Sequence, residues 1–184
     1  MTRSARLLLV AALAATSLAP ARADDNVQLI EQKIKAGLIY NFLKYTQWPQ
    51  SSRQTQGPVV VCMFGGDAFD GSLQPMAGRT VNERTIEVRD IANAADAASC
   101  ALLIINSAKR SDWPHLRTVL TGQSIMTVSD FDGFVAAGGM IEFTHADNRV
   151  TVTINTDAVA ATHLVVQDRL LKLASAVRAG TGGP

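Results

Sequence analysis

Two cysteines carry the clearest chemistry in this sequence of 184 residues. Cys62 lies within the apolar run Val59–Phe64, and Cys100 immediately precedes a second apolar run. If these runs form neighbouring strands, the two sulfur atoms can approach within bonding distance. A bond closing a loop of about 38 residues would then stabilise the fold by roughly 3 to 4 kcal/mol. The alternative is two reduced, buried cysteines that pack as small apolar side chains.

Histidine spacing and glycine motifs do not indicate catalysis. His115, His145 and His163 lack a partner at metal-ligand spacing, and the sequence contains no nucleophile-elbow, zinc-protease or phosphate-loop motif. The segment around Gly65 and Gly66 carries acids that would repel a phosphate, so we interpret it as a tight turn with a helix cap. We expect no enzyme activity, no cofactor and no metal site.

Polar residues follow several predicted strands, where an open α/β sheet presents a crevice to ligands. These candidate crevice residues are Asp67, Asn106, Ser107, Ser129 and Asp130. Together they are suited to a small polar or cationic ligand. Ser, Asp and Asn are also the preferred helix caps, so capping is the competing interpretation.

Phe131, Phe134 and Met140 lie outside any periodic pattern. A loop with two aromatic residues and a methionine can pack into the core, or it can offer apolar anchors to a partner protein. The three residues are therefore candidates for partner binding.

The first element expected to position these residues is a helix over Val27–Trp48. Ile30, Ile34, Leu38 and Phe42 recur every four residues, with the charged residues mostly elsewhere. This spacing predicts an amphipathic helix whose apolar stripe faces the core.

The rest of the chain alternates short apolar runs with segments of helical composition. We expect strands at Val59–Phe64, Thr85–Val88, Ala101–Ile105 and Ser124–Val128, helices at Asn93–Ala98 and Trp113–Leu120, a hairpin of Met140–His145 and Val150–Asn155 turning at Asp147–Asn148, and a closing helix from about Thr156 to Val177. The pattern predicts one α/β domain: a mixed sheet of about six strands with helices on both faces, followed by a C-terminal β-hairpin and helix.

The N-terminus has the composition of a secretory signal peptide. Arg3 and Arg6 precede the apolar run Leu7–Leu18, and Ala21 and Ala23 then provide small residues at the two recognition positions. The apolar run of about 12 residues is shorter than the roughly 20 needed to cross a bilayer. We predict cleavage after Ala23 and a periplasmic protein.

That cleavage would divide the chain into a signal peptide over 1–23, an α/β domain over 24–179 and a disordered tail over 180–184. Cys62 and Cys100 would then enter an oxidising compartment, where thiols tend to pair. A net charge of +1 with 5% aromatic residues leaves neither a basic surface nor stacking platforms, which argues against nucleic-acid binding.

Taken in order, several segments resemble the YfiR/HmsC family of periplasmic regulatory proteins. They are Lys35–Phe42 leading to Trp48–Pro49, Val61–Cys62 with Gly65–Phe69, Cys100 before Leu102–Ile105, Thr127–Asp130 followed by Phe134 and Gly138–Ile141, and Ile154–Asn155 ahead of Arg169–Leu171. The resemblance spans about residues 30 to 175.

The resemblance implies a periplasmic protein without catalytic activity that represses an inner-membrane diguanylate cyclase by binding its periplasmic sensor domain. Such repression lowers cyclic-di-GMP and limits biofilm formation. It further implies a homodimer, sequestration by an outer-membrane lipoprotein, and redox-sensitive cysteine pairs. Cys62 and Cys100 match one such pair, whereas the second pair of some relatives is missing here. The alternative is a periplasmic small-ligand receptor that reports to a sensor kinase or transporter.

Overall fold

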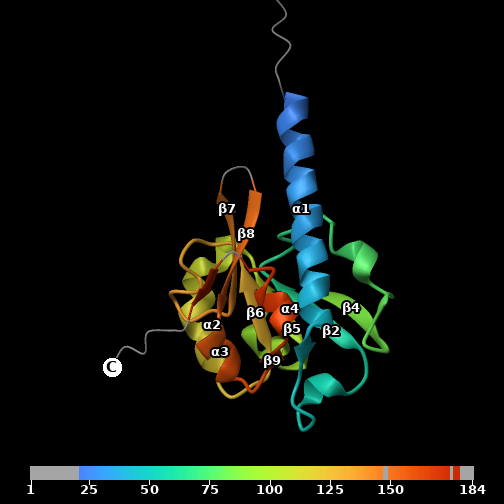
Figure 1. Ribbon diagram of the computed structural model, residues 1–184, viewed down its shortest axis with the longest axis vertical. Coiled ribbons are helices and arrows are strands. Elements are labelled where there is room, and N and C mark those ends of the chain that lie inside the picture. Colours follow the sequence, from blue (N-terminus) through green and yellow to red (C-terminus); the bar gives the residue numbers. More distant parts are fainter. Residues whose placement is uncertain (1–20, 147–148, 175, 179–184) are drawn as a thin grey trace, which may run out of the picture.

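An eight-stranded mixed sheet forms the middle of the protein in a computed structural model that describes residues 21–146, 149–174 and 176–178 (Figure 1). In spatial order its strands are β10 (Ala176–Arg178), β8 (Arg149–Asn155), β7 (Ile141–Ala146), β6 (Met126–Ser129), β5 (Leu102–Ile105), β2 (Val59–Phe64), β4 (Arg84–Ile91) and β3 (Thr80–Val81). The strands from β4 to β7 pair in parallel, and β7–β8 and β3–β4 are antiparallel hairpins. A separate antiparallel pair joins β1 (Thr46–Gln47) to β9 (Val165–Val166).

Three predictions fall outside the described residues. They are the signal peptide up to residue 20, the hairpin turn at Asp147–Asn148 and the tail over 180–184. Within the described part of the chain, none of the helices combines the length and apolar character that a membrane span requires.

Strands β2, β5 and β6 form the centre of the sheet. The sequences of β2 and β5 are apolar on both faces, whereas β6 carries Met126 and Val128 on one face and Thr127 and Ser129 on the other. Every residue of these three strands is buried. Parallel strands covered on both sides characteristically consist of such continuous apolar runs. The predicted α/β class, the central strands and the β7–β8 hairpin are confirmed.

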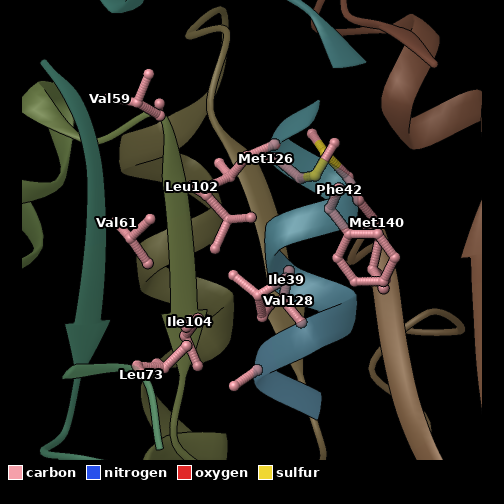
Figure 2. Packing of buried hydrophobic residues seen from close by; sticks show 14 of the residues in the cluster. Ile39, Phe42, Val59, Val61, Leu73, Leu102, Ile104, Met126, Val128 and Met140 are labelled. Carbon is pink, nitrogen blue, oxygen red and sulfur yellow. The ribbon is translucent and has the colours of Figure 1, made fainter. Parts of the chain in front are cut away.

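Helix α1 (Ala21–Lys44) covers one face of the sheet with its C-terminal half. Ile39 and Phe42 point toward Leu102, Ile104 and Val128 of β5 and β6 (Figure 2). The Phe42 ring also stacks on Phe143 of β7 at 5.9 Å between ring centres. This packing forms the larger of two buried clusters.

Helix α2 (Trp113–Leu120) covers the opposite face, together with the 3₁₀ helices η3 (Ala94–Ser99) and η4 (Ser107–Asp112). The second buried cluster lies beneath them and includes Cys62 and Leu103. Helices therefore flank both faces, as predicted, although the segment expected as a helix at Asn93–Ala98 is a 3₁₀ turn. Two further 3₁₀ turns are η1 (Arg53–Thr55) and η2 (Gln74–Met76).

The buried stripe predicted on the first helix needs correction. Ile30 and Ile34 are 52% and 48% exposed, whereas Lys35 is buried. At 3.6 residues per turn, a repeat of four residues advances by about 40° at each step, so the stripe winds away from the sheet. The residues that meet the sheet are Ile39, Phe42 and their neighbours, and the N-terminal half extends beyond it (Figure 1).

The closing helix predicted from about Thr156 to Val177 is also wrong. The chain forms a short α3 (Thr156–Ala160), then β9, a single-turn α4 (Asp168–Leu171) and β10. His163 adopts a positive φ of 59°, which ends the helical path. The β-branched pair Val165–Val166 then pairs with β1, which favours strand over helix. The strands β3 and β10 raise the sheet from about six strands to eight.

Candidate functional site

Cys62 and Cys100 form a disulfide between β2 and the segment that leads into β5. Their Cα atoms lie 5.8 Å apart, and both residues are fully buried. Directly beside the bond, the Ala101 N–H donates to the Val60 carbonyl at 2.8 Å. The pairing that the sequence left open is therefore formed, and it closes a separation of 38 residues. Its sensitivity to redox state stays a prediction.

Two of the candidate crevice residues accept hydrogen bonds from nearby backbone N–H groups. Asp67 accepts hydrogen bonds from the backbone N–H of Phe69 at 2.8 Å and of Gly71 at 2.7 Å. Asn106 accepts from the Ala108 N–H at 2.9 Å, at the start of η4. Asn106 is therefore a helix cap, as the competing interpretation holds, whereas Asp67 closes a turn at which no helix begins.

The strand-end residues after β5 and β6 have different environments. Ser129 is buried and donates to the Ile105 carbonyl at 2.7 Å, which ties β6 to β5. Ser107 is exposed on η4. Asp130 forms an ion pair with Lys35 at 3.4 Å. Parallel pairing brings all five candidates to the same end of the sheet, beyond the C-terminal ends of the strands. Four of them make contacts within the protein. A ligand-binding role for the set stays a prediction.

Lys35 is the centre of a charged network that the sequence did not reveal. Its amine lies 2.8 Å from one Glu31 oxygen, in addition to its contact with Asp130. The other Glu31 oxygen lies 3.0 Å from Nδ1 of His145. Glu31 and Lys35 come from α1, Asp130 follows β6, and His145 lies on β7. The network therefore fastens α1 to two parts of the sheet edge.

The network also sets the protonation behaviour of Glu31. Partial burial by itself raises the pKa of this carboxyl, but the hydrogen bond and the charge of Lys35, with smaller contributions from His145, outweigh that cost and leave the pKa below its ordinary value. Glu31 is therefore a carboxylate at neutral pH. The four-residue spacing of Glu31 and Lys35 was the available sequence signal, because such pairs meet on a helix surface.

The Phe131–Met140 loop packs inward, which is the first of the two alternatives that the sequence left open. Phe131, Phe134 and Met140 are all buried. The Phe134 ring lies 4.6 Å from Trp113 and 5.0 Å from Phe131, between ring centres. These side chains are part of the buried core of the folded chain.

Two backbone features explain why that loop turns inward. The carboxylate of Glu142 accepts from the N–H groups of Gly133 at 3.1 Å and Val135 at 2.9 Å, which satisfies the loop backbone from the neighbouring strand. A Cβ on Gly139 would lie 2.3 Å from the Phe134 ring, so glycine permits the close approach. A buried acid with no periodic pattern around it gave no sequence signal for this role.

The exposed apolar surface lies instead on the N-terminal half of α1. Val27, Leu29, Ile30 and Ile34 are between 40% and 52% exposed. This part of α1 projects past the body of the protein beside the β7–β8 hairpin (Figure 1). Between helix and hairpin lies a groove of about 340 Å³, here called the α1–hairpin groove, lined by Val27, Ile30, Glu31, Ile34, His145, Arg149 and Val150.

A second exposed apolar group lies near the C-terminus. Val165 on β9 is 58% exposed, and Leu173 after α4 is 45% exposed. Val165 also borders a largely polar hollow of about 650 Å³ beside β1, whose lining includes Trp48, Arg84 and His163. Contiguous exposed apolar patches indicate protein-contact surfaces, whereas single exposed apolar side chains are common on folded domains.

Comparison with known proteins gives two findings. The model of a family described as YfiR/HmsC-like matches residues 32–175, which is most of the chain. A solved structure described as the ABC domain in complex with L-Trp from Streptococcus pneumonia is similar at a TM-score of 0.48 and 9% identity, over 65% of this chain and 55% of that one. The matched part therefore spans about half the length of that solved structure.

Proposed function

The chain belongs to the YfiR/HmsC-like family, and from that premise we propose that it binds and represses an inner-membrane diguanylate cyclase through the cyclase's periplasmic sensor domain. The family supports a periplasmic regulator of cyclic-di-GMP signalling in general, and the proposal names the target. Repression lowers cyclic-di-GMP and thereby biofilm formation. The protein acts as a homodimer, and an outer-membrane lipoprotein relieves repression by sequestering it.

The observation that carries the proposal is the family match, which extends over residues 32–175. The mechanism requires no chemistry from this chain. A domain that binds one conformation of a receptor more tightly than another shifts the receptor equilibrium by that difference in affinity. A hundredfold preference, for example, corresponds to about 2.7 kcal/mol at 25 °C.

We assign the receptor contact to the C-terminal part of the chain, where Val165 and Leu173 are exposed. These side chains are exposed in the folded chain, unlike Phe131 and Phe134. A protein contact obtains much of its affinity from apolar side chains that lose water on binding. Val165 is also suited to a test of this role. Its substitution removes contact area without opening a cavity in the core.

Co-expression with a membrane diguanylate cyclase that carries a periplasmic sensor domain, taken from the same genome, tests the proposal. We expect cellular cyclic-di-GMP, measured by mass spectrometry, to fall when the chain is exported, and the sensor domain to co-purify with it without added ligand. Unchanged cyclic-di-GMP together with no complex would refute the proposal.

Two matched variants locate the contact. Val165→Glu should restore cyclic-di-GMP toward the level without repressor. Ser107→Glu adds the same charge at an exposed position on η4 and should leave repression intact. If Ser107→Glu abolished repression and Val165→Glu did not, the receptor contact would lie at the strand-end crevice and not at Val165.

A further inference from the structure

We propose that the α1–hairpin groove binds a single-chain anionic amphiphile, the carboxylate of a fatty acid, with its tail between helix and hairpin and its head group at Arg149. The groove is separate from the strand-end crevice and from Val165, so this binding site goes beyond the repression of a cyclase. Three features of the groove support the occupant: aliphatic walls, a cation without a partner, and the position of that cation at the outer end.

Both walls of the groove carry aliphatic side chains. Val27, Ile30 and Ile34 follow the spacing of three and then four residues that places side chains on one helix face, and each is about half exposed. Val150 lies on the hairpin wall. An acyl chain between the two walls would remove these side chains from water, and burial of apolar surface is the main source of affinity for such a ligand.

The size of the groove suits a small ligand. Its volume of about 340 Å³ lies at the lower end of the range for small-molecule sites, which is roughly 300 to 1,000 Å³. Such sites combine mostly apolar walls with a few polar groups that fix the orientation of the ligand. A single acyl chain with one charged head group matches this composition.

The cation without a partner is Arg149. Both oxygens of Glu31, the acid in the lining, are already paired, with the Lys35 amine at 2.8 Å and with Nδ1 of His145 at 3.0 Å. Lys35 also pairs with Asp130, but that carboxylate does not line the groove. Arg149 is exposed, and no ion pair or hydrogen bond to its side chain is present in the described part of the chain. A guanidinium binds a carboxylate through two parallel N–H bonds, so the groove favours an anionic head group.

The order of the residues places this cation at the outer end of the groove. Arg149 pairs with Ala146 beside the hairpin turn, and Val150 lies one position nearer the centre of the sheet. On α1, Ile34 lies about 6 Å nearer the sheet than Ile30, at 1.5 Å per residue. An amphiphile with its head group at Arg149 would therefore extend its tail inward toward Ile34. Its charged head would stay at the solvent-exposed end, which avoids the cost of burying it.

Isothermal titration calorimetry of the exported protein with dodecanoate, at neutral pH and below the critical micelle concentration, tests the proposal. We expect dodecyltrimethylammonium, which has the same chain length and a cationic head, to bind at least about tenfold more weakly than dodecanoate. Decanoate should also bind several-fold more weakly, because each methylene that is fully buried contributes about fourfold in affinity.

Matched substitutions locate the site. Arg149→Gln should weaken dodecanoate binding by about tenfold. Lys33→Gln removes the same charge from an exposed lysine of α1 that does not line the groove, and it should change the affinity by less than about twofold. Ile30→Glu should abolish binding with an unchanged circular dichroism spectrum. Val165→Glu adds the same charge to an exposed valine away from the groove and should retain binding.

Methyl NMR of the wild-type protein keeps the test independent of whether a variant folds. Dodecanoate should shift the methyl signals of Ile30, Ile34 and Val150, which line the groove, and leave those of Val165 unchanged. Shifts confined to Val165, or none at all, would overturn the proposed site.

Other outcomes would overturn the occupant. These are no heat with dodecanoate up to about 1 mM, equal affinity for the two head groups, or unchanged binding in Arg149→Gln. Wild-type protein that binds phosphatidylglycerol vesicles through Ile30 but does not bind monomeric dodecanoate would assign the aliphatic stripe to a membrane surface instead. None of these measurements involves a cyclase, so the fatty-acid site can fail while repression is retained, and the reverse.

Discussion

The two halves of α1 have similar aliphatic content and opposite environments. In the C-terminal half, Ile39, Phe42 and Leu43 are at most 1% exposed, whereas Ile30 and Ile34 in the N-terminal half are about half exposed. Length explains the difference. A helix of 24 residues is about 36 Å long, whereas the four-residue strands β5 and β6 span only about 13 Å. The helix is longer than the sheet it covers, so one half stabilises the fold and the other is free to bind.

The Lys35 network marks the boundary between the two halves. Lys35 is 6% exposed and pairs with Glu31 on the free side and with Asp130 at the sheet edge. A buried ion pair contributes little net stability, but breaking it leaves an uncompensated charge, which is costly. We infer that the network fixes where the helix leaves the sheet. The predictions below test this division in order of expected effect.

The largest effect should come from the supported half. Phe42→Ala removes a fully buried ring that stacks on Phe143, so we expect a loss of about 3 to 5 kcal/mol in the free energy of unfolding. Urea denaturation followed by circular dichroism measures it. A loss below about 1 kcal/mol would show that the C-terminal half of α1 is not part of the core.

Removing the disulfide should weaken the sheet beneath the supported half. Cys62→Ser combined with Cys100→Ser releases a loop of 38 residues, and we expect the free energy of unfolding to fall by about 3 to 4 kcal/mol. Hydrogen exchange should accelerate at Ile39 and Phe42, whose amides open with the core. Amides around Ile30 should change little. Equal acceleration in both halves would contradict the division.

The boundary itself should respond to pH. Because the folded pKa of Glu31 is lowered, its contribution to stability is complete above the unfolded pKa and is lost as pH falls through the folded pKa. We expect Glu31→Gln to cost about 1 kcal/mol at pH 7, because Lys35 then keeps only Asp130. The difference from wild type should shrink as the pH is lowered below about 4.5, the ordinary value for this carboxyl.

Lys35→Met is the control for that measurement. It replaces the buried amine by an apolar side chain of similar length, but it removes the ion-pair partner of Asp130 and one partner of Glu31, so it should cost at least as much as Glu31→Gln. If the difference in the free energy of unfolding between wild type and Glu31→Gln is the same at pH 7 and pH 3, the network does not act through the Glu31 charge.

The sequence predicts those features that depend on local pattern. Continuous apolar runs predicted β2 and β5, a mainly apolar run predicted β6, and the predicted export signal together with Cys62 and Cys100 suggested the disulfide that the structure forms. Which face of α1 is buried could not be predicted, because it depends on the length and position of a sheet assembled from distant segments. The burial of Phe134 could not be predicted either. It depends on the contact with Trp113 and on the hydrogen bonds from the loop backbone to Glu142, and both form only in the folded chain.

The smallest effect on monomer stability should come from the free half. Ile34→Ala removes a side chain that is half exposed, so we expect a change within about 0.5 kcal/mol at concentrations where the protein is monomeric. Urea denaturation at low protein concentration measures the change. A loss above about 1 kcal/mol would show that Ile34 packs against its own chain much as Phe42 does, and would contradict the division of α1 into a supported and a free half.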